Sequence, residues 1–166
     1  MGNDSTSDMG GNYPLALIPL QKSNPENVQL EKGRIIAIDP GGTTGIAVRK
    51  EDGEIYLTQL TKPSELWEFL RGYRRVEEQG TIICENFSTA GRISSAGLHT
   101  VRLVGGVQAI GWVMGWPVYT PEPAQRIMMR EKAEEIAPRK HELRHQRDAL
   151  MHLLAFEFRR KKGMYR

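Results

Sequence analysis

The chain has 166 residues, of which 39% are hydrophobic, and a formal net charge of +3. This length fits one domain that can close a hydrophobic core. Its single cysteine, Cys84, excludes an internal disulfide framework and a zinc site built from several thiolates. The sequence shows no apolar run near the roughly 18 residues that span a bilayer, and no signal-peptide pattern. We therefore expect no membrane partner and a cytoplasmic protein, or one associated with the nucleoid inside a host cell.

Charge is distributed unevenly along the chain. Residues 1–32 contain two bases and four acids, whereas residues 125–166 contain twelve bases and six acids. The basic end suits contact with phosphates and would make binding depend on salt. A solvated charged tail is an equally good interpretation. The tail residues that we predict to bind DNA are Arg159, Arg160, Lys161 and Lys162.

The first 32 residues are rich in Gly, Asn, Ser, Asp and Pro, which favours a flexible N-terminal arm. Residues 33–166 are then expected to form the folded domain with its basic C-terminal tail. The domain begins with three strand-like runs at residues 35–39, 45–49 and 55–60. Asp52-Gly53 supplies the turn between the last two, so these runs are predicted to form an antiparallel meander.

Helices and strands alternate after the meander. We predict a helix from residue 63 that ends before residue 80, a strand at 81–85, a helix at 94–115, a strand at 116–120, and helices at 123–136 and from 141 to about 160. This order is typical of a ribonuclease-H-like α/β fold. Its mixed five-stranded sheet combines the antiparallel three-strand meander with parallel strands and is flanked by helices.

Three acids lie at the ends of buried elements. Asp39 closes the first strand, Glu85 closes the fourth, and Asp148 begins the apolar half of the last helix. In this topology the first and fourth strands are parallel neighbours, so Asp39 and Glu85 are expected within a few ångströms of each other. Each acid alone is more often a cap or an ion-pair partner, and it is the set of three that indicates chemistry.

Carboxylates gathered in a partly buried site repel one another, and a divalent cation relieves that repulsion. Oxygen ligands without thiolates favour Mg²⁺ or Mn²⁺. Two such ions about 4 Å apart can activate a water and stabilise the leaving oxygen of a phosphodiester. His145 shares a helix face with Asp148 and is either a further ligand or a proton shuttle. For His152, one turn beyond Asp148, the structural interpretation is preferred.

Three segments resemble those of the RuvC-type Holliday junction resolvases, a family of the ribonuclease-H-like nucleases. They are IIAIDPGGTTGIAV at residues 35–48, IICENF at 82–87 and HQRDALMHLLA at 145–155. The resemblance extends from about Arg34 to Phe158, and the order and spacing of the segments make it fairly specific. A phage or mobile-element version would fit so compact a chain, whose N-terminal arm has no counterpart in that family.

The resemblance implies an endonuclease that cuts branched DNA such as four-way junctions. It implies that Asp39, Glu85, His145 and Asp148 are the catalytic set and hold two Mg²⁺ ions, which Mn²⁺ can replace, with no nucleotide cofactor. It also implies a homodimer with one active site for each of two opposite strands. The family also has an aromatic residue that wedges into the junction, and Phe87 matches it here. Its basic residue that contacts the scissile phosphate is matched by Arg126 or Lys132.

Three other functions are considered. A ribosomal-RNA-processing nuclease related to RuvC would share the first strand and the glycine loop that follows Asp39. A non-catalytic module that binds branched DNA would have no need for crowded acids. A sugar-kinase or actin-like ATPase would also explain Asp39-Pro40-Gly41-Gly42-Thr43, but it needs a duplicated domain for which this chain has no room.

Overall fold

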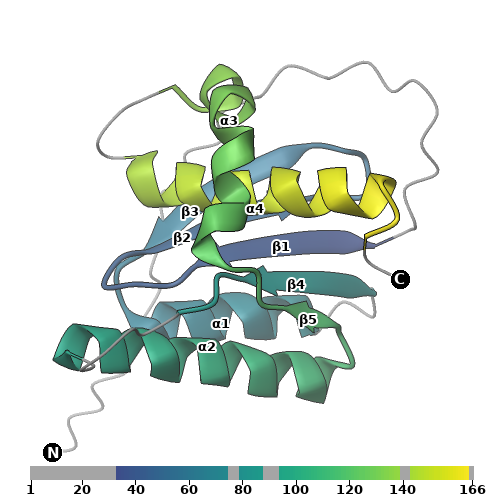
Figure 1. Ribbon diagram of the computed structural model, residues 1–166. Coiled ribbons are helices and arrows are strands. Elements are labelled where there is room, and N and C mark those ends of the chain that lie inside the picture. The colour runs from purple at the N-terminus through teal and green to yellow at the C-terminus, as the bar shows by residue number, and fades with distance from the viewer. Residues whose placement is uncertain (1–32, 75–78, 88–93, 139–142, 165–166) are drawn as a thin grey trace, which may run out of the picture.

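The structure, a computed structural model, describes residues 33–74, 79–87, 94–138 and 143–164. The predicted N-terminal arm, residues 1–32, lies outside the described residues. The described chain forms three layers, in which a five-stranded sheet is covered by helices on both faces (Figure 1). None of the described helices is long and apolar enough to cross a membrane.

The sheet has the strand order β3-β2-β1-β4-β5. The strands are β1 (Arg34–Asp39), β2 (Thr44–Arg49), β3 (Ile55–Leu60), β4 (Gly80–Cys84) and β5 (Val118–Tyr119). The first three form the antiparallel meander, whose second turn contains Gly53 at a φ of 85°. β4 and β5 continue the sheet as parallel strands beside β1. This mixed sheet confirms the ribonuclease-H-like fold class predicted from the sequence.

The helices divide between the two faces of the sheet. They are α1 (Pro63–Arg74), α2 (Ser95–Met114), the 3₁₀ helix η1 (Pro123–Met129), α3 (Arg130–Ile136) and α4 (Arg144–Lys161). α1 and α2 pack on one face, and α4 packs on the other with η1 and α3 against its outer side (Figure 1). α4 is therefore enclosed between two layers, which explains why every residue from Ala149 to Phe156 is buried.

The single helix predicted for residues 123–136 is wrong in its first half, where the chain winds as η1 before α3 begins. In a 3₁₀ helix residues three apart lie on one side, so Arg126 and Met129 share a side. Met129 is buried against α4 and Arg126 reaches the carboxylates described below. These tertiary contacts explain the tighter winding, which hydrophobic periodicity alone does not reveal.

Alternation along β1 and β4 decides which way the two strand-end acids point. In β1, Ile36 and Ile38 pack toward α1 and α2, whereas Ile35 and Ala37 pack toward α4. Because successive side chains point to opposite faces of a sheet, Asp39 belongs to the α4 side. Ile83 of β4 also packs toward α4, so Glu85, two residues later, lies on that side as well. Both acids therefore face the start of α4.

Gly45 of β2 sets how closely α4 approaches the sheet. Gly45 pairs with Asp39 in the antiparallel ladder. A Cβ atom at position 45 would overlap the backbone carbonyl of His145, in the first turn of α4. The absence of a side chain thus lets the backbone of α4 lie directly on β2, beside the end of β1. This contact brings His145 and Asp148 to the same edge of the sheet as Asp39.

We expect Gly45→Ala to lower the free energy of unfolding by about 1–3 kcal/mol, the usual range for overpacking a tight contact. The backbone at His145 cannot rotate away as a side chain could. Urea denaturation measures the change. The control is Gly42→Ala, since a Cβ atom there meets nothing within 4 Å. Equal stability of the two variants would contradict the close packing of α4 on β2.

Candidate active site

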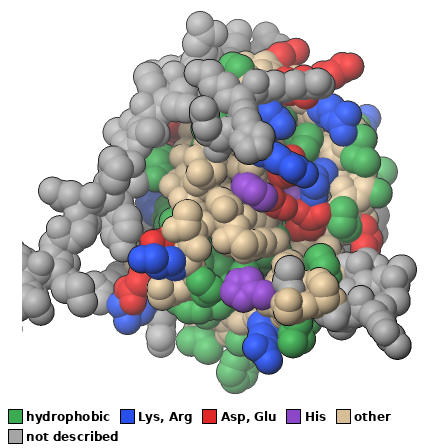
Figure 2. All heavy atoms as spheres, turned by 90° about the vertical axis from the view of Figure 1, so that its left-hand side faces the viewer, with side chains coloured by type: hydrophobic (Ala, Val, Ile, Leu, Met, Phe, Trp, Pro, Cys, Tyr) green, Lys and Arg blue, Asp and Glu red, His purple; other side chains and the backbone are tan. Residues whose placement is uncertain are grey.

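Three carboxylates from distant parts of the chain meet where β1, β4 and α4 come together. Asp39 is the last residue of β1, and Glu85 follows β4 directly. The backbone N–H of Glu85 donates to the carbonyl of Ile38 over 3.0 Å, which continues the parallel ladder and places the two acids side by side. Asp148 completes the group from the second turn of α4. Figure 2 shows acidic, basic and histidine side chains gathered on this face of the molecule.

Arg126 of η1 lies among these carboxylates. Its Nη1 forms an ion pair with Oε1 of Glu85, and its Nη2 donates to Oδ2 of Asp148 over 3.5 Å. The side chains of all three residues are largely buried, with exposed fractions of 21% or less. One guanidinium thus bridges an acid after β4 and an acid on α4, and it supplies a positive charge between them.

Two histidines of α4 bind the same acids. Nδ1 of His145 lies 3.2 Å from Oδ2 of Asp39, and Nε2 of His152 lies 3.1 Å from Oε2 of Glu85. The His152 side chain is fully buried, and its Nδ1 has no hydrogen-bond partner among the described residues. Nη1 of Arg126 lies 3.2 Å from the same Nε2, so this nitrogen contacts both Glu85 and the guanidinium that pairs with Glu85. His152 therefore orients Glu85 from within the core.

The clustered charges shift the pKa values of both strand-end acids. Burial raises the pKa of Asp39, and the neighbouring Glu85 and Asp148 raise it further, to about 9. Burial is the largest single influence on Glu85 and acts in the same direction, but hydrogen bonds from His152, Asp39 and Arg126 and the attraction of His152 together outweigh it and lower the pKa of Glu85 to about 2. At neutral pH Glu85 is consequently ionised, while Asp39 keeps its proton and shares it with Glu85.

Not every residue predicted for the site lies in this group. Phe87 follows Glu85 by two residues and is 40% exposed, whereas Lys132 lies exposed on α3. The predicted basic tail is in fact the last turn of α4 and the residue after it. Arg159 is eleven residues beyond Asp148, about 16 Å along a helix that rises 1.5 Å per residue. It donates to Gln125 over 2.7 Å, away from the carboxylates.

Sequence reasoning missed two features of the site. It assigned Arg126 to a scissile phosphate and did not anticipate its ion pairs with Glu85 and Asp148. It also favoured a purely structural role for His152, which contacts Glu85 directly. The available signal was the spacing of His145, Asp148 and His152, which places all three on one stripe of α4.

Two solved structures of RuvC from Thermus thermophilus are similar to this chain. The structure of RuvC in complex with a Holliday junction substrate has 22% sequence identity and a TM-score of 0.55, and the match covers 78% of this chain and 96% of that chain. The chain has the RuvC fold. A second RuvC structure gives 21% identity and a TM-score of 0.54 over the same shares. No family model and no curated protein sequence matches the chain.

Among the described residues of this RuvC fold, no three acids, histidines or cysteines stand in the arrangement of a metal centre. The ion pairs of Arg126 give the physical reason, because its guanidinium lies between Glu85 and Asp148. The three carboxylates supply only oxygen donors, which suit a hard divalent cation. They would suit such an ion if the guanidinium moved aside.

The raised pKa of Asp39 leads to a prediction for the metal-free protein. A group whose pKa is about 9 when folded and 3.8 in its unperturbed state contributes stability below about pH 4, and that contribution is lost as the pH rises toward 9. Asp39→Asn keeps the shape without the charge, so we expect it to raise Tm in EDTA by more at pH 8 than at pH 5. A gain independent of pH would contradict the buried, protonated state of Asp39.

Proposed function

We propose that this protein is a divalent-metal-dependent endonuclease that resolves Holliday junctions and other branched DNA by paired phosphodiester hydrolysis. One observation carries the proposal: Asp39, Glu85 and Asp148 converge on one largely buried spot of a RuvC fold. A RuvC of this fold has been solved in complex with a Holliday junction substrate, which supports the choice of DNA.

The proposed cofactor is Mg²⁺, with Mn²⁺ as a substitute and two ions at each site. Asp39, Glu85 and Asp148 would hold the ions. When bound, such ions activate a water and stabilise the leaving oxygen of a phosphodiester. Arg126 must leave the carboxylates for this to happen, and its guanidinium is then free to meet a phosphate.

The chain's own residues would contribute positioning and proton transfer. His152 holds Oε2 of Glu85 from the core, so this acid keeps one orientation. Nδ1 of His145 lies 3.2 Å from Oδ2 of Asp39, and this contact fixes the orientation of the ring. Nε2 is then the ring nitrogen that remains for proton transfer. We propose that Nε2 of His145 takes the proton of the attacking water, the role that distinguishes a shuttle from a ligand.

Arg126 also supports a second candidate function, that of a metal-independent module that binds branched DNA. A guanidinium that already pairs with Glu85 and Asp148 reduces the need for a cation. The two functions differ in one assay. A synthetic four-way junction incubated with Mg²⁺ is nicked at paired, symmetric positions by a resolvase and stays intact with a binding module. Structured RNA as a parallel substrate tests the related RNA-processing activity.

We expect Asp39→Asn, Glu85→Gln and Asp148→Asn each to lower junction cleavage by more than about 100-fold, the upper end of what losing a supporting residue of a metal site costs. Binding to the junction in the absence of cleavage should stay within a few-fold of wild type, because the fold is unchanged. Asp52→Asn in the exposed β2–β3 turn is the matched control. Full activity in any of the three variants would overturn the assigned set.

A homodimer is part of the proposal, and α2 offers a surface for it. Trp112 is 84% exposed, and Leu98 and Val101 on the same helix are exposed as well. Gly105 and Ala109 lie between them on the exposed side and leave room for a close helix. A second copy of α2 fits this apolar face, and two copies supply the two active sites that paired cuts require.

We expect the wild-type protein to sediment as a dimer and Trp112→Lys to shift it toward the monomer by at least about tenfold in the dissociation constant, because a charge replaces a large aromatic contact of the proposed interface. Sedimentation velocity over a concentration series measures this. The control is Met164→Lys, an exposed apolar residue beyond the end of α4. A monomeric wild type, or a Trp112→Lys variant that dimerises normally, would contradict the α2 interface.

A further inference from the structure

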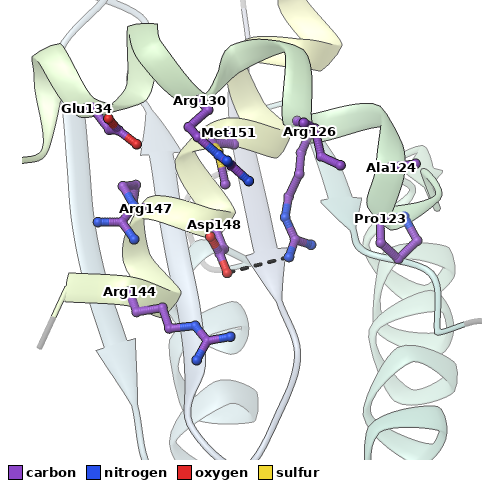
Figure 3. Close-up of a pocket in the computed structure, with 10 residues that line it drawn as sticks. Pro123, Ala124, Arg126, Arg130, Glu134, Arg144, Arg147, Asp148 and Met151 are labelled. Carbon is purple, nitrogen blue, oxygen red and sulfur yellow. Dashed lines mark hydrogen bonds and ion pairs between the residues drawn. The ribbon is translucent and has the colours of Figure 1, made fainter. Parts of the chain in front are cut away.

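A cavity of about 550 Å³ lies beside Asp148, between the start of α4 on one side and η1 with α3 on the other (Figure 3). Arginines outnumber acids on its wall by four to two. The charged residues that line it are Arg126, Arg130, Arg144, Arg147, Asp148 and Glu134. In Figure 3, Arg130 and Arg144 lie on opposite sides of Asp148, with Arg126 beside it.

Three of the arginines are not used by the carboxylate cluster. Arg126 is bound to Glu85 and Asp148, but no hydrogen bond or ion pair joins Arg130, Arg144 or Arg147 to another described side chain. Arg130 and Arg144 are exposed and Arg147 is half-buried, so the cavity is open to solvent. Positive charges that crowd one cavity repel one another until an anion enters it.

The start of α4 increases this positive potential. The first turn of α4 contains no acid, and Leu143 before it provides no side-chain cap. The N-terminal end of a helix carries a partial positive charge, so arginines in its first turn are unfavourable without an anion. Arg144 and Arg147 both occupy this end of α4. Their placement is explained if an anion binds in the cavity they line.

We propose that this cavity binds a backbone phosphate of the DNA strand that is cut, next to the phosphate that meets the carboxylates. Guanidinium groups match a phosphate because two parallel N–H groups can donate to two of its oxygens. Asp148 and Arg126 belong both to the cavity wall and to the carboxylate cluster, so the two phosphate positions are adjacent. The cavity then fixes which bond of the strand reaches Asp39, Glu85 and Asp148. This inference rests on the proposed function for the identity of the strand.

The test is binding of a labelled four-way junction in EDTA, where no cleavage occurs, over a series of salt concentrations. We expect Arg144→Gln combined with Arg147→Gln to weaken binding by about tenfold or more. The plot of log K against log salt should become shallower by about one unit. The control combines Arg71→Gln in α1 with Lys62→Gln just before it, which removes the same charge from the opposite face of the sheet. Control and cavity variants with the same salt slope would overturn the inference.

Two further measurements make the result specific to the cavity. Arg130→Gln changes the opposite wall without altering α4, so it should reproduce the weaker binding if the double variant unfolds. A junction with single neutral methylphosphonates identifies the phosphate itself. One position should weaken wild-type binding and leave the double variant unaffected, and the absence of such a position would overturn the inference. If free inorganic phosphate competes for the cavity as strongly as the junction does, the cavity is a simple anion site and the inference is likewise overturned.

These experiments separate failure of the inference from failure of the proposed function. If the wild type cuts the junction and the cavity variants bind normally, the nuclease remains and the cavity site is rejected. If the wild type binds through the cavity but does not cut in Mg²⁺, the cavity site remains and the nuclease is rejected. A wild type that does not bind the junction overturns both.

Discussion

The close packing of α4 on β2 at Gly45 is the contact on which the site depends. The carboxylates of β1 and β4 are placed by the sheet, but Asp148 and His145 are placed by a helix more than fifty residues further along the chain. Because Gly45 has no side chain, the backbone of His145 can lie against the strand that pairs with Asp39. Ala37 and Ala47 continue this narrow surface beneath α4. Small residues on the sheet thus determine how far apart the acids lie.

Electrostatics then decides how these acids coexist without a bound ion. Three mostly buried carboxylates would repel one another strongly, and two features of the protein reduce this repulsion. Asp39 retains a proton, and Arg126 supplies a positive charge to Glu85 and Asp148. Any cation that binds here must displace both, so its observed affinity is lower than the affinity of the bare carboxylates. If the proposed metal binds, the strength of the Arg126 ion pairs would therefore set the concentration of metal that the site requires.

The sequence predicts the sheet well because each of its signals is local. Alternating apolar residues mark β1, and Asp52-Gly53 marks a turn. Ser94 and Gly115 mark the two ends of α2. The proximity of Asp39 and Glu85 also follows, because neighbouring parallel strands end at one edge. The 3₁₀ winding of η1 does not follow, since it depends on contacts of Arg126 and Met129 with distant elements. The pairing of His152 with Glu85 and the arginine-lined cavity have the same non-local origin.

The position of Cys84 has a practical consequence for work on this molecule. Its thiol is fully buried between the sheet and α1 and α2, and burial raises the pKa of the Cys84 thiol far above its usual range. Since the reactive form of cysteine is the thiolate, this side chain should resist maleimides and mild oxidants. The sequence contains no other cysteine. A fluorophore or spin label attached to one engineered surface cysteine would therefore report from a single known position, without removal of the native thiol.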